Sequence, residues 1–271
     1  MKSIHTQKGF TLVELAIVMT IIGLLIGGIL KGQELMENAR VTSTVAQVKS
    51  YEAAVTTFRD SYNAVPGDIA NAEDRIPGCV EACNAAAVGA GDGIVGDIGW
   101  ATDDYAAQVT AAMDGATPST VEQETQLFWV HLLKADLIAG VTDAPIRTAG
   151  GVFGWGESHP AARIGGGFVV GQGNGTTAPG AVTASTSTGI SGMVLVLQTA
   201  PGVDPAVTAG TQPMTPARAA QIDRRIDDGR PNSGYVHGYG LTASCYNDAN
   251  DTRYAEAVTS KDCGLVMRIQ G

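Results

Sequence analysis

Residues 10–30, FTLVELAIVMTIIGLLIGGIL, form a long apolar run that contains a single charged residue, Glu14. As an α-helix this run spans roughly 32 Å at about 1.5 Å per residue, which is enough to cross the hydrocarbon core of a bilayer. The run therefore predicts a membrane-spanning helix near the N-terminus. A carboxylate inside such a helix costs free energy and usually has a function, so Glu14 is a candidate functional residue.

The segment before the run, residues 1–9, is short and polar and carries Lys2 and Lys8. Basic residues before a span keep that end in the cytoplasm, so we expect the chain after Lys31 to lie outside the cytoplasm. A secretory signal peptide ends in a small-residue cleavage site after its apolar part, and no Ala-x-Ala pattern follows this run. We expect instead that the run continues into a longer helix.

Residues 31–62 predict that continuation, because they contain no proline and Gly32 is their only glycine. Their apolar residues recur at a spacing of three and four, which predicts one stripe that packs against a globular domain. The turn signal Pro66-Gly67 follows the helix. The stripe consists of Val41, Val45, Val48, Val55, Phe58 and Tyr62.

The heptapeptide Lys8-Gly9-Phe10-Thr11-Leu12-Val13-Glu14 resembles the cleavage and methylation motif of type IV prepilins and type II secretion pseudopilins. The resemblance implies that a membrane peptidase, the prepilin peptidase, cuts between Gly9 and Phe10 and methylates the new amine of Phe10. Glu14 takes the family's acidic position. There it can neutralise the amine of a neighbouring subunit, or its own N-terminus one turn away. Beyond the N-terminal helix, the chain matches the family only in general layout.

The expected fold class is α+β, with a long N-terminal helix packed on an antiparallel sheet of about four strands, as in type IV pilins, and with loop and short-helix insertions. The expected parts are a leader (1–9), a transmembrane or filament-core half-helix (10–30), an amphipathic half-helix (31–62) and an extracytoplasmic globular domain (63–271). Further helices are predicted at 122–140 and 215–228. Strands are predicted at 168–170, at 193–197 and, as an edge strand, at 265–269.

The four cysteines form two local pairs, Cys79/Cys83 and Cys245/Cys263. In an exported chain such pairs indicate disulfides, whereas in a cytosolic chain they would indicate metal or redox chemistry. Because the predicted topology exports everything after Lys31, we expect disulfides Cys79–Cys83 and Cys245–Cys263. A metal site at the first pair would need two more ligands at suitable spacing, and the neighbouring sequence offers none.

Patterns typical of enzymes are weak in this chain. The glycines of 171–175 are not followed by a predicted helix, so they do not indicate a dinucleotide site. Ser158-His159 lies beside Pro160 without the spacing of a nucleophile elbow. His131 is predicted on the surface or half-buried side of the helix at 122–140. We therefore expect no enzyme and no catalytic residue.

Net charge and acidic residues bear on the ligands of the chain. The formal net charge is −10 and the sequence has no basic cluster, which argues against a nucleic-acid partner. Residues 89–97, GAGDGIVGD, favour a tight turn over a calcium loop. Major pseudopilins bind calcium in a C-terminal loop, so the resemblance makes Asp227 and Asp228 calcium candidates. No other cofactor is expected.

The function that the resemblance implies is that of a structural subunit, a major or minor pilin, in a homo- or hetero-oligomeric filament. Its precursor would sit in the bacterial inner membrane with the C-terminus outside, and the assembled pilus would be extracellular. One alternative is a type II secretion pseudopilin. A second, from a different class, is a membrane-anchored binding domain that never polymerises. An ordinary signal-anchor helix would account for the span, but for neither the Gly9-Phe10 junction nor Glu14.

Overall fold

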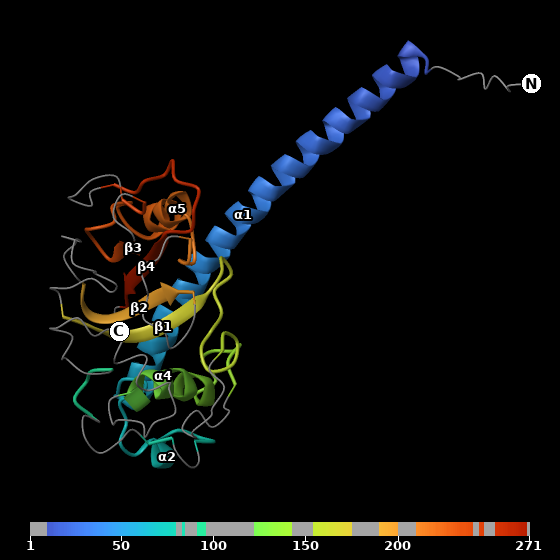
Figure 1. Cartoon of the computed structure of the whole chain (residues 1–271). Coiled ribbons are helices and arrows are strands. Elements are labelled where there is room, and N and C mark those ends of the chain that lie inside the picture. Colours follow the sequence, from blue (N-terminus) through green and yellow to red (C-terminus); the bar gives the residue numbers. More distant parts are fainter. Residues whose placement is uncertain are drawn as a thin grey trace, which may run out of the picture. The chain divides into compact units, whose positions relative to one another are not determined.

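The computed structural model describes residues 10–79, 83–84, 91–95, 122–142, 154–174, 190–199, 210–240, 244–246 and 253–269. The chain divides into two compact units, residues 1–40 and residues 41–271. The helices are α1 (Leu12–Tyr62), α2 (Ala72–Arg75), α4 (Glu122–Lys134) and α5 (Pro216–Ile226). The strands are β1 (Gly167–Asn174), β2 (Ser191–Gln198), β3 (Val236–Gly240) and β4 (Cys263–Arg268) (Figure 1).

The four strands form one antiparallel sheet in the order β1-β2-β4-β3, which confirms the predicted α+β class. The register places Val169 opposite Val196, Val196 opposite Val266, and Val266 opposite His237. Successive side chains of a strand point to opposite faces. This row therefore lies on one face of the sheet, and the residues next to it along each strand lie on the other.

The face opposite that row carries the main core. It brings Phe168, Leu197 and Leu265 into one apolar cluster with buried residues of the second half of α1, of α4 and of α5. The face with the row carries a smaller cluster of Val169, Ile190, Val194, Val196, Tyr239 and Val266. Strands buried on both faces explain why β2 carries the uninterrupted apolar run Met193–Leu197, and β1 the shorter run Phe168–Val170, rather than alternating patterns.

Within residues 41–271, the second half of α1 contributes buried side chains from Val41 to Phe58 to the main core. The predicted stripe faces this core, with Val45 and Tyr62 only partly buried, and it is broader than the sequence pattern indicated, because Thr44, Tyr51 and Ala54 are also buried. The Tyr51 ring meets Trp129 of α4 and Phe168 of β1 edge-on, with centroids 5.2 and 5.5 Å apart. Such edge-to-face pairs add stability beyond the area they bury.

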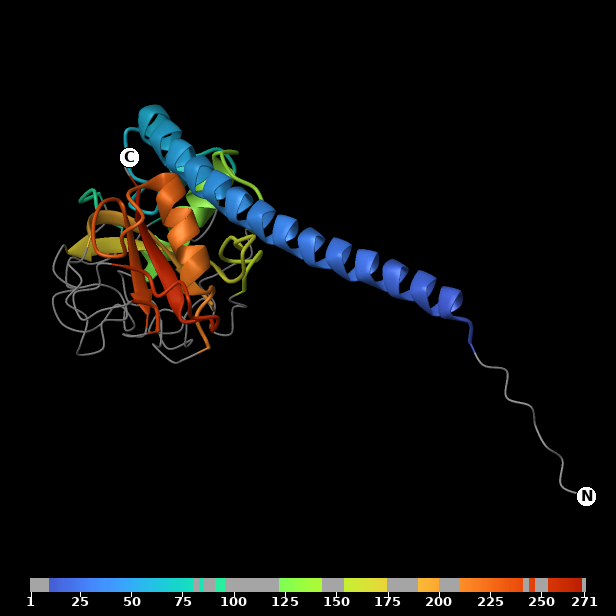
Figure 2. The same cartoon turned by 90° about the horizontal axis from the view of Figure 1, so that it is seen from above.

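Helix α5 begins and ends as its sequence predicts, apart from one or two residues. Thr215 takes the N-cap position and Pro216 the first helical position, although the Thr215 side chain makes no capping hydrogen bond. Figure 2 shows α5 beside the second half of α1, where the Arg225 guanidinium donates a hydrogen bond to the Thr42 hydroxyl. Its buried residues include Ala219 and Ile222.

The sequence predicted that helix α4 ends at Gly140, but the helix ends six residues earlier, at Lys134. Asp136 takes a left-handed conformation (φ 59°) and its N–H bonds to the Leu133 carbonyl, while the Leu137 N–H bonds to the Leu132 carbonyl. These two bonds form a Schellman ending, which an aspartate adopts less often than a glycine. The helix therefore closes on a residue that sequence patterns do not mark as a stop.

Strand β4 is an interior strand, so the predicted edge position of 265–269 is wrong. It pairs with β2 on one side and with β3 on the other. Strand β3, VHGYG, carries two glycines and a histidine in five residues, and the sequence did not predict it. Because β3 lacked the signature of a strand, the neighbour that makes β4 internal was missing from the expected sheet.

Candidate processing and assembly site

Helix α1 begins at a reciprocal pair of hydrogen bonds between Thr11 and Glu14. The Thr11 N–H donates to Glu14 Oε2 (2.9 Å), and the Glu14 N–H donates to Thr11 Oγ1 (3.2 Å). The Thr11 hydroxyl also donates to Glu14 Oε2, at 2.9 Å. This arrangement is a capping box, in which the N-cap threonine and the glutamate three residues later satisfy each other's backbone donors.

The N-terminal half of α1 exposes its apolar side chains within residues 10–40. The helix is long and apolar enough to cross a membrane, and its most apolar 18-residue window has a mean hydropathy of 2.5 with no buried part. Phe10 is 90% exposed and lies just outside the helix. The exposed large side chains of this half include Leu12, Val13, Leu15, Ile17, Val18, Met19, Ile21, Ile22, Leu24, Leu25, Ile26, Ile29 and Leu30.

The apolar half-helix, its lone carboxylate and the adjoining Phe10 coincide with a known motif. Residues 4–30 match the family model described as the prokaryotic N-terminal methylation motif. The chain carries the type IV pilin and pseudopilin signature. The motif implies a structural protein, and together with the apolar helix it fits an inner-membrane precursor. No match was found among curated proteins or among solved structures.

The predicted site residues Phe10 and Glu14 lie close together at the start of α1, within five consecutive positions. The third predicted residue, Gly9, lies outside the described residues. Capping the helix is a further role of Glu14, one that was not predicted. The Thr-x-x-Glu spacing before an apolar run is itself the signal that indicates it.

Both predicted cysteine pairs are joined as disulfides. Cys79 is bonded to Cys83, with Cα atoms 5.7 Å apart, and Cys245 to Cys263, with Cα atoms 5.1 Å apart. All four side chains are buried. The second bond ties residues 244–246 to the first residue of β4, an interior strand of the sheet.

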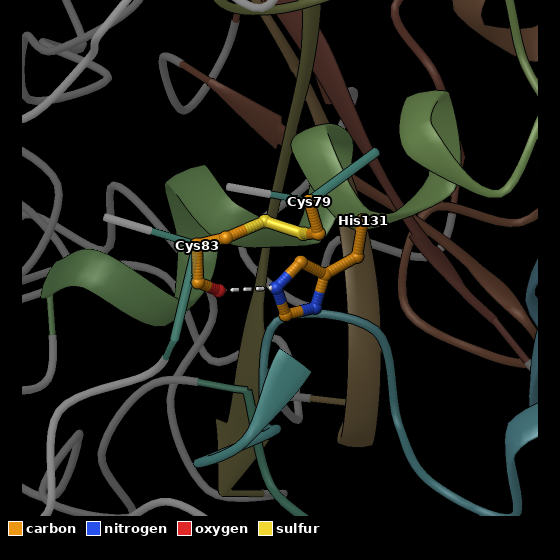
Figure 3. A group of neighbouring side chains, drawn as sticks. All are labelled: Cys79, Cys83 and His131. Carbon is orange, nitrogen blue, oxygen red and sulfur yellow. Dashed lines mark hydrogen bonds between the residues drawn. A yellow bond between two sulfur atoms is a disulfide. The ribbon is translucent and has the colours of Figure 1, made fainter. Parts of the chain in front are cut away.

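His131 lies against the first disulfide and not on the surface, so the predicted exposed or half-buried position is wrong. Its Nδ1 accepts a hydrogen bond from the Gly67 N–H (2.8 Å), so its Nε2 carries the proton and donates to the Cys83 carbonyl (2.8 Å; Figure 3). Burial lowers the pKa of His131 to about 4, against the opposite effect of the bond to Cys83. The neutral ring thus joins α4 to two distant segments.

Gly67 makes this contact possible because its backbone lies directly on α4. Its φ of 93° is in the left-handed region, and a Cβ at this position would collide with the Glu124 carbonyl oxygen. Glycine is therefore required for the turn to approach the helix closely. The next residue, Asp68, accepts hydrogen bonds from the Gly91 and Gly93 N–H groups.

Cys79, Cys83 and His131 bring three potential metal-binding atoms within 4.8 Å of one another. The two sulfur atoms are bonded to each other, and both ring nitrogens have backbone partners. A metal-bound cysteine is a thiolate, and a metal-bound histidine gives one nitrogen to the ion. As arranged, the group joins segments of the fold rather than forming a metal site.

The calcium candidates Asp227 and Asp228 lie with Asp223 in a second cluster, with one carboxylate oxygen of each within 4.8 Å of the others. Asp227 accepts hydrogen bonds from the Tyr235 and Val236 N–H groups. Asp228 accepts from the Arg230 N–H (2.8 Å) and the Ser233 hydroxyl (2.5 Å).

Asp223 is the buried member of this cluster. It accepts hydrogen bonds from the Tyr254 hydroxyl (2.9 Å) and the Gly229 N–H (3.1 Å). Burial raises the pKa of Asp223 to about 7, against the opposite effect of these two bonds. A calcium ion takes six to eight oxygen ligands. Here the carboxylates accept hydrogen bonds from N–H and O–H donors of the chain, and calcium at Asp227 and Asp228 stays a prediction.

Ser158 and His159 form a hydrogen-bonded pair in the loop before β1. The Ser158 hydroxyl lies 2.9 Å from His159 Nδ1, and both side chains are buried. Burial lowers the pKa of His159 to about 4. A nucleophile must reach its substrate, so this buried pair has the surroundings of a structural contact rather than a hydrolytic site.

Proposed function

We propose that the chain is a structural subunit of a type IV pilus-like filament, a major or minor pilin that assembles through the N-terminal half of α1. The observation that carries this proposal is the exposed apolar stretch of α1 within residues 10–30, which lies inside the methylation motif and holds one carboxylate, Glu14. Apolar surface of this extent is unfavourable in contact with water, so other apolar groups have to cover it. The bilayer covers it in the precursor, and the same half-helices of other subunits cover it in the filament.

Processing couples these two states. The prepilin peptidase removes residues 1–9 and methylates the amine of Phe10, which becomes the first residue of the mature subunit. The new ammonium group and Glu14 carry opposite charges, and inside a filament core such a pair is stable only when both members are present. Glu14 thereby sets the axial position of one subunit against the next.

The alternative within the superfamily is a type II secretion pseudopilin, which shares the same motif and the same processing. The alternative from another class is a membrane-anchored binding domain that is never polymerised. A pilin, a pseudopilin and a membrane-anchored binding domain would all use the exposed half-helix in the membrane. Only the pilin and the pseudopilin need Glu14 and the cut after Gly9.

The test is to shear filaments from the surface of the cells, image them, and identify their subunits by peptide mass fingerprinting. We expect surface filaments that contain this chain. Filaments that appear only when the chain is overproduced together with a type II secretion apparatus would favour the pseudopilin. A processed chain that stays in the membrane and occurs in no filament would contradict the proposal.

A further inference from the structure

The capping box at the start of α1 also bears on the step that creates the mature N-terminus. The helix begins at Leu12, and Phe10 and Thr11 lie outside it. The Thr11 carbonyl accepts the first helical hydrogen bond, from the Leu15 N–H (3.2 Å). Thr11 therefore caps a helix that begins three residues after Gly9, close to the junction where the proposed function places the cut.

The Thr11 side chain matters here because unpaired N–H groups are costly in and near a bilayer. At present the Glu14 N–H is satisfied by Thr11 Oγ1, and the Thr11 N–H by Glu14. Without this cap, those donors can be satisfied by one further turn of helix, in which each N–H bonds to the carbonyl four residues earlier. In that turn the Val13 N–H would bond to the Gly9 carbonyl.

The Gly9 carbonyl is the group that a peptidase has to attack in order to cut between Gly9 and Phe10. A carbonyl inside a helix is turned along the helix axis and occupied by its hydrogen bond, whereas cleavage favours backbone free of regular structure. A helix extended by one turn would thus protect the bond that must be cut.

We propose that Thr11 is a positioning residue for leader removal: its hydroxyl caps α1, ends the helix short of the cleavage site and keeps the Gly9 carbonyl available to the peptidase. This inference rests on the proposed function, because it presupposes a cut between Gly9 and Phe10. It adds a residue whose contribution is made through the conformation of the substrate and not through contact with the peptidase.

The test compares the full-length precursor and its variants as substrates of purified prepilin peptidase in detergent. Thr11→Val keeps the shape of the side chain and removes the capping oxygen. We expect its kcat/KM for leader removal to fall about fivefold, which corresponds to the roughly 1 kcal/mol usually lost with an N-cap. Thr11→Ser and Thr11→Asn restore a capping oxygen and should stay within about twofold of the wild type.

Two further measurements separate capping from other roles of Thr11. Thr20→Val is the matched control, because the Thr20 hydroxyl bonds to the Ile17 carbonyl (2.8 Å) farther along the same helix. It should leave the cleavage rate unchanged. A 13C label in the Gly9 carbonyl should give a helical amide I frequency in Thr11→Val and a non-helical one in the wild type and in Thr11→Asn.

The outcomes distinguish this inference from the function on which it rests. Wild-type cutting rates in Thr11→Val would overturn the inference alone. So would a Thr11→Asn variant as slow as Thr11→Val, because the peptidase would then be reading the threonine directly. A wild-type precursor that is not cut between Gly9 and Phe10 would overturn the proposed function and this inference with it.

Discussion

Glu14 is the only charged side chain between residues 10 and 30, and it already has a partner within its own chain. Its bonds to Thr11 lower the cost of placing a carboxylate at the membrane, because hydrogen bonds replace part of its hydration. In the proposed filament, assembly would then be an exchange, in which Glu14 turns from Thr11 to the amine of Phe10 on a neighbouring subunit.

Changing Glu14 to Ala should leave membrane insertion equal or improved and should leave cutting nearly intact, since the Glu14 backbone N–H can still bond to Thr11. Filament yield should collapse, because the Phe10 amine would enter the core without a partner, at a typical cost of about 3–5 kcal/mol. Glu14→Gln should be nearly as damaging, because it keeps the shape and loses the charge. The measurement compares the amount of mature subunit in membranes with the amount in sheared filaments for each variant. A normal filament yield from Glu14→Ala would contradict the pairing mechanism.

His131 predicts a defined pH dependence of stability. Between an ordinary pKa of about 6.5 and its folded value of about 4, the unfolded chain binds a proton at this ring and the folded chain does not. Protonation therefore favours unfolding, and the contribution of neutral His131 is lost as the pH falls from about 6.5 towards 4. The full loss is about 3 kcal/mol.

Denaturant unfolding of a fragment that lacks residues 1–35, with the wild-type sequence and with His131→Gln, measures this contribution. At pH 7 the variant should be about 1–3 kcal/mol less stable, because glutamine reproduces the two backbone contacts imperfectly. The gap should close as the pH is lowered to 4.5. Asp223 and His159 also titrate but are the same in both proteins, so their effects cancel in the difference. A gap that is equal at both pH values would contradict the assignment of a neutral buried ring.

Among single residues, the sequence indicates those whose role is local and does not indicate those whose role depends on distant segments. Glu14 and the cysteine pairs stand out by position and spacing alone. His131 does not, because its partners, Gly67 and Cys83, lie 64 and 48 positions away in the chain. Asp223 is hidden in the same way, since its partner Tyr254 is 31 positions away.

Among the elements, the two disulfides differ in what they hold. The Cys245–Cys263 bond closes a separation of 18 residues onto the interior strand β4, and the Cys79–Cys83 bond closes a separation of only 4. Chain-entropy estimates give about 3 kcal/mol for the longer loop and about 2 kcal/mol for the shorter one.

Replacing each pair by alanines should therefore cost more for Cys245/Cys263 than for Cys79/Cys83, by about 1 kcal/mol in the free energy of unfolding. Denaturant unfolding of the fragment that lacks residues 1–35 checks the order, after non-reducing peptide mapping has verified the bonds in the wild type. Four free thiols, or crossed pairs, would overturn the disulfide assignment. A larger loss from the Cys79/Cys83 change would mean that the contacts around His131 outweigh loop entropy.

Elements with strong periodicity or strong end signals were predictable, and elements defined by their neighbours were not. The long helix α1 follows from its uninterrupted apolar pattern, and α5 from Thr215-Pro216 and Gly229. β3 was missed because its glycines serve packing between strands and loops, as where a side chain at Gly238 would crowd Tyr254 and Pro231. Its absence from the predicted sheet also made β4 an apparent edge strand.

For the whole molecule, the division at residues 40 and 41 predicts that assembly and folding are separable. Deleting residues 1–35 removes the exposed apolar half-helix and keeps the buried stripe from Val41 to Phe58. The fragment should be folded, soluble without detergent and monomeric, as shown by circular dichroism and light scattering. Strong aggregation, or filaments formed by the fragment, would contradict the assembly role of the N-terminal half of α1.

The central claim is that this chain is a precursor whose N-terminus is cut, modified and then built into a filament. Mass spectrometry of the N-terminal peptide from purified filaments tests it most directly. The predicted peptide begins at Phe10, lacks residues 1–9 and carries one additional methyl group on its amine. Filament subunits that retain the intact Met1–Gly9 leader, or that begin at any other residue, would contradict the claim.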